Sequence, residues 1–296
     1  MNKKVRATLF GLSVSLLLVS VISHGQSRGQ QSSGPQAGGP GQRGQQEPSY
    51  TRTVTPYDKL PDWSGAWAMM GGTVFDRATQ TGQGGAVNAG VREHPPYNTE
   101  WEGIYQKSLD KRDKNLLPDT ITNCGVPVGF PRMFNLPDPY EFVVRPEESW
   151  ILAENGPNVM RVYTDGRKHL EDQWETYTGD SVGHWEGDTL VFTTIGLKGN
   201  RDGDVIIDRT GLVLSDKSHA TTRMRKIDDN TIEVVMTIED SKALTKPWVV
   251  TKQFRKQPPG TRLYDYGCAE NNRNPVDEKT GKTLLLGPNG TPLKID

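Results

Sequence analysis

Three histidines in the second half of the chain are the side chains best suited to move a proton near neutral pH. They are His169, His184 and His219, and an unperturbed imidazole titrates close to pH 6.5. Glu239, at the end of a predicted strand, and Glu270, further along the chain, are carboxylates that can share acid and base roles when their environments separate their pKa values. These five residues are the candidates for general acid/base catalysis. For each of them, a solvent-exposed or structural role is the alternative.

Basic and aromatic side chains near these histidines are the candidates for substrate contacts. Arg167 precedes His169 in the string YTDGRKH, where it is placed to bind an anionic group while the histidine transfers a proton. Asp165 and Gly166 in the same string are also explained by a simple turn, since Asp bonds its own backbone and Gly accepts a positive φ. The further candidates for ligand contact are Arg223, Trp150, Tyr163, Trp185 and Trp248.

The string GDSVGHWEGDTLVFTT, residues 179–194, has Ser181 at the nucleophile position of a GxSxG pattern. A hydrolase nucleophile of this kind needs a strand before it and a helix after it, whereas the residues that follow here alternate as in a strand and a hairpin. Glu186 and Asp188 are explained by the hairpin turn. His184 and Trp185 fall on opposite faces of the predicted strand, so only one of them can face an interior.

Strand alternation does not show whether the polar face of residues 219–227 points into the barrel or toward solvent. Residues 219–227 place His219 and Arg223 on one face of a predicted strand, together with another threonine and arginine. If this face points inward, His219 and Arg223 are ligand contacts. If it points outward, they belong to a solvated surface.

Metal and cofactor motifs are not evident in the sequence. Spacings of 15 and 35 residues separate the three histidines, and these match no local metal-binding pattern. A GxGxxG string at Gly39, Gly41 and Gly44 lies in a polar tract without the flanking strand and helix of a dinucleotide site, and there is no P-loop. The sequence therefore predicts neither a metal nor a cofactor; the alternative is a metal site at which the three strands carrying these histidines converge.

Short β-rich runs separated by turn residues dominate the chain from residue 140 onward. Their period-two alternation and short hairpin links predict an antiparallel meander, which closes into a calycin-like barrel of about 8–10 strands because closure removes unpaired edges. Residues 62–72 are the predicted first strand. The other predicted strands are 140–144, 149–154, 159–163, 173–177, 181–185, 189–194, 205–214, 219–227, 231–240, 246–254 and 262–267.

One helix is predicted before the strands, in residues 97–114. Thr99 and Glu102 have the spacing of a capping box, and Trp101, Tyr105 and Leu109 fall on one face at helical spacing. This aromatic stripe is explained by core packing.

The beginning of the chain is typical of an exported protein. Residues 1–25 carry basic residues followed by an apolar run and small residues, as in a secretory signal peptide. Residues 26–54 form a Gly/Gln/Ser/Pro-rich tract that predicts a disordered linker, and residues 55–296 form one predicted domain. We therefore expect a periplasmic or secreted protein with no membrane span after signal cleavage.

Charge and cysteine content add two further expectations. The first 46 residues hold five basic and no acidic residues, so the rest carries 30 basic and 36 acidic residues; this balance argues against a nucleic-acid partner. Cys124 and Cys268 are predicted to form a disulfide in an exported protein, with two buried free thiols as the alternative.

Several blocks of the sequence resemble a known group of proteins. CGVPVGFPRMF, YTDGRKH, GDSVGHWEGDTLV, TIEDSKALTKPW and YGCAENN are similar to recurring blocks of an uncharacterised family of exported bacterial proteins. The resemblance covers roughly residues 62–273 and implies an exported, β-rich protein. It implies no particular activity.

Taken together, these features predict an exported β-barrel that binds a small organic ligand in its interior. Cofactor-independent acid/base chemistry, as in a lyase, hydrolase or isomerase, is the slightly favoured function, with a histidine as proton carrier and an arginine as substrate contact. A non-catalytic ligand-binding protein is the first alternative. An envelope-associated structural module is the second.

Overall fold

The computed structural model describes residues 50–76, 93–114, 116–117, 119, 127–155, 159–172, 174–199, 205–265, 267 and 279. The chain divides into two compact units, residues 1–47 and 48–296, and all described residues belong to the second. The predicted signal peptide, Cys124, Cys268 and Glu270 lie outside the described residues. The export signal, the disulfide and the role of Glu270 therefore stay predictions.

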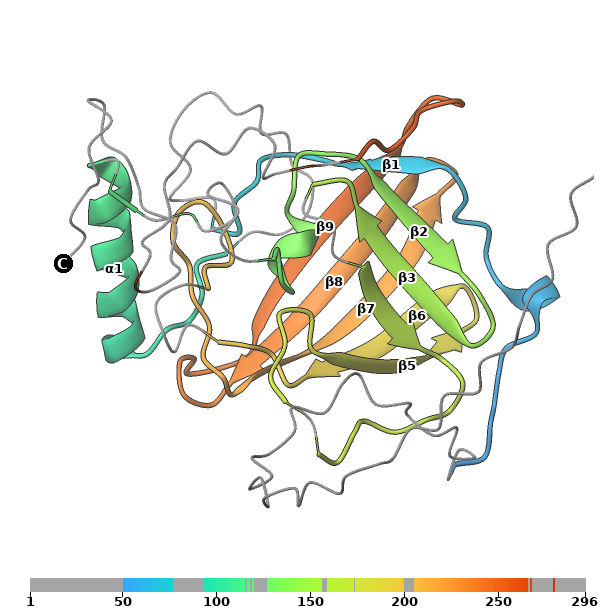
Figure 1. Ribbon diagram of the computed structural model, residues 1–296, viewed down its shortest axis with the longest axis horizontal. Helices are drawn as coiled ribbons and strands as arrows, with labels where there is room; N and C mark the ends of the chain where they lie inside the picture. Colours follow the sequence, from blue (N-terminus) through green and yellow to red (C-terminus); the bar gives the residue numbers. More distant parts are fainter. Residues whose placement is uncertain are drawn as a thin grey trace, which may run out of the picture. The chain divides into compact units, whose positions relative to one another are not determined.

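Nine strands form a closed barrel in which each strand pairs with its neighbours in sequence and the last pairs with the first (Figure 1). The predicted mainly β, calycin-like barrel of about 8–10 strands is confirmed. The strands are β1 (Ala66–Met69), β2 (Tyr140–Val144), β3 (Glu148–Ala153), β4 (Val159–Tyr163), β5 (Asp180–Glu186), β6 (Thr189–Ile195), β7 (Ser218–Asp228), β8 (Thr231–Asp240) and β9 (Trp248–Lys256).

One pair of neighbours, β4 and β5, is parallel, so the prediction of a purely antiparallel meander is wrong at this point. The reason is parity: strand direction cannot alternate all the way around a closed ring of nine. Parallel neighbours need a connection that returns along the barrel, and residues 164–179, which we call the crossover, provide it. The predicted strand at 173–177 belongs to this crossover, where Thr176 forms only an isolated bridge with Leu197.

Two other predicted strands are also absent from the part of the chain that the structure describes. Residues 205–214 form a turn in which Ile207 N–H donates to Leu212 O at 2.8 Å, and Asp208 accepts from the backbone and hydroxyl of Thr210. Residues 262–265 are not in a strand. The hydrogen bonds that the Asp208 side chain accepts within this turn replace those that the backbone would make to a neighbouring strand.

The predicted helix is present as α1 (Thr99–Asp113), with two short 3-10 helices, η1 (Tyr57–Lys59) and η3 (Arg132–Phe134), elsewhere. The N-cap of α1 is Asn98, whose side chain accepts a hydrogen bond from Trp101 N–H at 3.1 Å. The predicted capping box based on Thr99 is therefore wrong, because Thr99 is already helical. Trp101 and Tyr105 are buried, as predicted for a core-facing stripe. In the described residues, no helix has the length and apolar character needed to cross a membrane.

The inside of the barrel is a packed aromatic and aliphatic core. Inward residues of β8 alternate strictly, and aromatic rings of β2 and β9 meet in the centre, with Tyr140 and Phe254 centroids 4.9 Å apart and Phe142 and Phe254 centroids 5.3 Å apart. Burying each such side chain contributes about 1.5–3 kcal/mol. Among the described residues, side chains therefore fill the middle of the barrel around Tyr140, Phe142 and Phe254.

Candidate functional site

The crossover holds His169 against the outer face of the barrel. His169 Nδ1 lies 2.8 Å from Asp180 Oδ2, and its Nε2 lies 2.7 Å from Thr193 Oγ1 on the exposed face of β6. Because a carboxylate only accepts, Nδ1 carries the proton, and Nε2 of the neutral ring accepts from the threonine hydroxyl. Leu170 N–H also donates to Asp180, at 3.1 Å. This order of carboxylate, imidazole and hydroxyl is that of an oriented base beside a nucleophile.

Arg167, the predicted anion contact, is already paired within the crossover. Its guanidinium donates to both carboxylate oxygens of Asp165, at 2.9 and 2.7 Å, and lies 3.9 Å from the centroid of the Tyr163 ring. Tyr50 O–H also donates to Asp165, at 2.5 Å. Burial raises the pKa of Asp165, but the hydrogen bonds from Arg167 and Tyr50 outweigh it and lower this pKa to about 2. Thr53 N–H donates to Asp165 O, so residues 50–54, assigned to the linker from composition, lie against the barrel domain.

Two small cavities flank the crossover on the outside of the barrel. One, of about 210 Å³, lies between the crossover and β4, and exposed Leu170 and Trp174 border it together with Tyr163 and Asp180. The other, of about 310 Å³, is bordered by the Tyr163–Arg167 stack and the charged side chains of residues 52, 147 and 148. Both cavities lie beside paired charges.

A larger opening of about 540 Å³ lies in the barrel wall where β1 separates from β2. The two strands share only two register pairs, whereas β2 and β3 share five. Gly65, with φ of +98°, turns the chain away just before β1, a backbone conformation that glycine adopts without the steric cost of a Cβ. We call this feature the wall opening. Its lining residues are Tyr57, Leu60, Pro61, Asp62, Trp63, Ser64, Gly65, Glu141, Phe142, Val143 and Val144.

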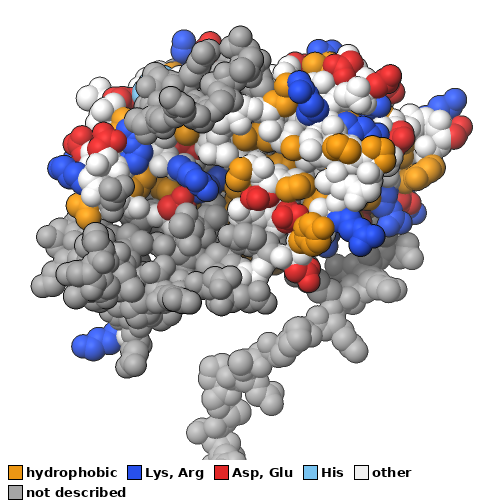
Figure 2. All heavy atoms as spheres, turned by 90° about the horizontal axis from the view of Figure 1, so that it is seen from above, with side chains coloured by type: hydrophobic (Ala, Val, Ile, Leu, Met, Phe, Trp, Pro, Cys, Tyr) orange, Lys and Arg blue, Asp and Glu red, His pale blue; other side chains and the backbone are white. Residues whose placement is uncertain are grey.

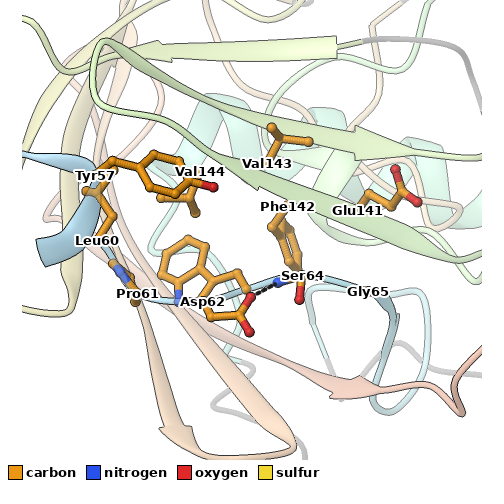
Figure 3. Close-up of a pocket in the computed structure, with 11 residues that line it drawn as sticks. Tyr57, Leu60, Pro61, Asp62, Ser64, Gly65, Glu141, Phe142, Val143 and Val144 are labelled. Carbon is orange, nitrogen blue, oxygen red and sulfur yellow. Dashed lines mark hydrogen bonds between the residues drawn. The ribbon is translucent and has the colours of Figure 1, made fainter.

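The wall opening combines apolar surfaces with two acidic side chains. Figure 3 shows Asp62 on the segment before β1, where it accepts a hydrogen bond from Ser64 N–H at 2.8 Å, and shows Phe142 and Val144 on β2. The hydrogen bonds from Ser64 lower the pKa of Asp62, so its carboxylate is ionised at neutral pH. Glu141 lies on β2, and the described residues that line the opening include no lysine, arginine or histidine.

Trp63 brings a buried aromatic ring to the same opening. Its side chain is buried, with the residue only 2 % exposed, and its indole N–H has no hydrogen-bond acceptor in the described chain. The ring packs edge-on against Trp185, with centroids 5.2 Å apart. The indole N–H groups of Trp101, Trp150 and Trp185 are also buried without a partner in the described chain, so the ring, and not its N–H, is what Trp63 contributes to the opening.

The remaining histidine candidates lie on the outer face and do not converge. His184 Nε2 lies 3.1 Å from Glu186, which also accepts from Arg223 at 2.8 Å, and His219 lies 3.2 Å from Glu239 across β7 and β8. His219 and Arg223 therefore point outward, the second of the two alternatives. Basic and acidic side chains are interspersed on the face shown in Figure 2.

The aromatic candidates are likewise distributed among different surroundings. Trp185 faces the interior and His184 does not, as expected for neighbouring residues on opposite faces of a strand. Trp248 is in the core and donates through Nε1 to Glu93 O at 2.9 Å, while Trp150 lies under Arg161, 5.6 Å from its ring. Ser181 is buried and hydrogen-bonded to Thr194 at 2.8 Å, so it is not exposed as a nucleophile on a strand-to-helix turn.

Sequence reasoning missed the functional potential of Asp180, Thr193, His94 and the residues of the wall opening. His94 bridges Asp76 through Nδ1 and Glu102 through Nε2, each at 2.7 Å. Burial lowers the pKa of His94, but the hydrogen bonds to these carboxylates outweigh it and raise the pKa overall. The only local signal was the position of Glu102 on the first turn of a predicted helix. Asp76 is brought in by the fold.

Within the described residues, no group of three or more His, Cys, Asp or Glu side chains is arranged to hold a metal ion. No protein-family model matches the chain, and no curated protein matches it. The candidate sites therefore rest on their own geometry.

Proposed function

We propose that the protein is exported from a bacterial cell and binds a small organic ligand in the wall opening between β1 and β2. The single observation that carries this proposal is the opening itself, whose volume of about 540 Å³ falls within the range of about 300–1,000 Å³ for small-molecule sites. One side of the opening is β2 of the closed barrel, and a side held in a fixed position reduces the entropy lost on binding.

The lining of the wall opening also supports a ligand site. Trp63, Phe142, Leu60 and Val144 supply apolar contact area, and Asp62 supplies an ionised group. The lining exposes polar and apolar surface in nearly equal parts, and small-molecule sites use apolar surface for contact area and polar groups to fix orientation. A ligand here would bury apolar surface while remaining reachable from solvent.

A fragment screen by ligand-observed NMR tests this function. It should use the full mature chain and include cationic, neutral and anionic fragments. Ser64→Trp places an indole at the exposed rim without removing the backbone N–H that Asp62 accepts. Ser241→Trp, in the exposed turn after β8, adds the same side chain elsewhere. We expect fragments that bind the wild type and Ser241→Trp but not Ser64→Trp; unchanged binding to Ser64→Trp would overturn the proposal.

A second function, ester hydrolysis, is favoured by the hydrogen bonds that link Asp180, His169 and Thr193 in series. In this mechanism Thr193 Oγ1 attacks the ester carbonyl carbon while its proton passes to His169 Nε2. The proton leaves with the alcohol. Water, deprotonated by the same imidazole, then hydrolyses the threonyl ester to the acid and restores the hydroxyl. Asp180 holds the ring in the required tautomer.

Turnover of p-nitrophenyl acetate tests the second function. We expect Thr193→Val and His169→Gln to lower the rate by about a hundredfold or more, and Thr193→Ser to retain part of it. Thr221→Val, at the position paired with Thr193 on β7, is the matched control. A wild-type rate equal to that of Thr193→Val would assign this hydrogen-bonded chain to anchoring the crossover alone.

A further inference from the structure

We propose that the ligand of the wall opening is an organic cation, a protonated amine or a quaternary ammonium attached to an apolar body. This inference rests on the proposed function of the opening. It follows from two features of the lining: acidic side chains without an ion-pair partner in the described chain, and exposed and buried aromatic rings.

The acidic side chains of the opening have no ionic partner. Asp62 and Glu141 come from opposite sides of the opening, one from the segment before β1 and one from β2. No ion pair to either carboxylate occurs in the described part of the chain, whereas Glu147, Asp180, Glu186 and Glu239, each near a strand end, have one. Lys226 and Lys256 contribute to keeping Asp62 ionised, but neither lines the opening. A bound cation would supply the missing counter-charge, whereas an anion would meet two like charges.

Aromatic rings make the same opening suitable for a cation with an apolar body. Tyr57, Trp63 and Phe142 all line it, and the face of an aromatic ring attracts ammonium groups within about 6 Å. The protein already uses this interaction elsewhere, for example with Lys256 Nζ 5.6 Å from the Trp67 ring centroid. Leu60 and Val144 extend the apolar surface for the rest of the ligand.

Trp63 contributes its ring to this surface, but its indole N–H adds no requirement for the ligand. That N–H is fully buried, and the indole N–H groups of Trp101, Trp150 and Trp185 are also buried without a partner in the described chain. The inferred ligand class is therefore an amphiphilic amine or ammonium compound.

Dansylcadaverine is a suitable probe, because it joins a primary amine to an aromatic sulfonamide by an apolar chain. Its N-acetyl derivative has the same body without the positive charge. Titration of the mature protein with each, followed by dansyl fluorescence, should give binding of the amine at least about tenfold tighter than binding of the acetylated probe. Raising the salt concentration should reduce that ratio.

The double variant Asp62→Asn, Glu141→Gln removes both charges while keeping similar shapes, and the new amide oxygen at the first position can still accept from Ser64 N–H. We expect this variant to bind the two probes with nearly equal affinity. Glu171→Gln with Asp172→Asn, two exposed acidic residues on the crossover, removes the same charge elsewhere and should keep the wild-type ratio.

Failure of the cation proposal can be told apart from failure of the binding proposal. If both probes bind equally to the wild type and Ser64→Trp blocks both, the opening is a ligand site without preference for cations, and this inference is overturned. The same holds if the double variant keeps the wild-type ratio. If neither probe binds, or if Ser64→Trp leaves binding unchanged, the proposed function of the opening fails as well.

Discussion

The crossover and the wall opening are two places where the regular antiparallel ladder of the barrel is interrupted, and they differ in how their acidic side chains are paired. In the crossover, Asp165 is paired with Arg167, and Asp180 with His169. In the wall opening, Asp62 and Glu141 have no ionic partner among the described residues. Paired charges hold a returning segment in place, whereas unpaired charges at a cavity remain available to a ligand. The comparison therefore assigns anchoring to one interruption and recognition to the other.

Among the substitutions that distinguish the two regions, Asp165→Asn should cause the largest loss in the free energy of unfolding. The pKa of Asp165 is lowered to about 2 from 3.8, which corresponds to about 2 kcal/mol of the free energy of unfolding at neutral pH. Because the folded-state pKa lies below the unfolded one, this contribution is present above about pH 4 and is lost as the pH falls toward 2. Urea unfolding of the wild type and variant between pH 3 and pH 7 measures it. Asp62→Asn, at the exposed rim of the opening, should change stability by much less than Asp165→Asn; an equal loss would break the comparison.

Gly65→Ala tests the backbone that creates the wall opening. At φ of +98° a Cβ is strained, although the nearest atom to it, Lys256 Cε at 3.4 Å, is in ordinary contact range. We expect a loss of about 1 kcal/mol or more in thermal or urea unfolding. Gly103→Ala, in the middle of α1 with nothing within 4 Å, should instead raise stability by about 0.5–1 kcal/mol. If Gly65→Ala and Gly103→Ala changed the free energy of unfolding in the same direction, this account would be contradicted.

Thr193→Val measures how strongly the crossover is anchored. It removes the hydroxyl that bonds His169 Nε2 while keeping a β-branched side chain of similar size, so we expect a loss of about 1 kcal/mol in the free energy of unfolding. In the variant, the amides of residues 164–179 should exchange faster than in the wild type, and the exchange of the amides in β6 should change less. No change in either measurement would remove the anchoring role.

The smallest effect should come from His94, which lies away from both interruptions and serves as a reference for pH. Its folded-state pKa is raised, so the stabilisation from Asp76 and Glu102 is fully present below the unfolded pKa of about 6.5 and is lost as the pH rises through the higher folded value. Because the imidazole is about 42 % exposed, we expect less than about 1 kcal/mol. The stability difference between wild type and His94→Gln should be larger at pH 5.5 than at pH 8.5; the reverse order would contradict it.

Local alternation was sufficient to predict most of the barrel. Eight of the nine strands coincide with predicted β-rich runs, and β1 lies within the predicted first strand. The choice between His184 and Trp185 also followed from alternation, since the tryptophan gains more from burial. Strand direction could not be predicted, because the parallel pair of β4 and β5 follows from the parity of the whole ring.

The candidate sites were less predictable than the strands because they depend on contacts between distant segments. His169 was selected for its chemistry, but its partners Asp180 and Thr193 are 11 and 24 residues away and meet it only when the crossover folds back. The wall opening has no sequence signal of its own, since Asp62 and Gly65 resemble an ordinary turn. Its second acidic residue, Glu141, is supplied by β2 through strand pairing.

The pairing of β1 with β9 also has a consequence for how the chain acquires its structure. Trp67 pairs with Lys256, so the ring closes through a contact of very high sequence separation, and such contacts form slowly. Nearly the whole chain must be synthesised before this strand pair can exist. A nascent chain that cannot yet close its barrel stays unfolded for longer. The same late closure would make the unpaired edges of β1 and β9 the main aggregation risk before folding is complete.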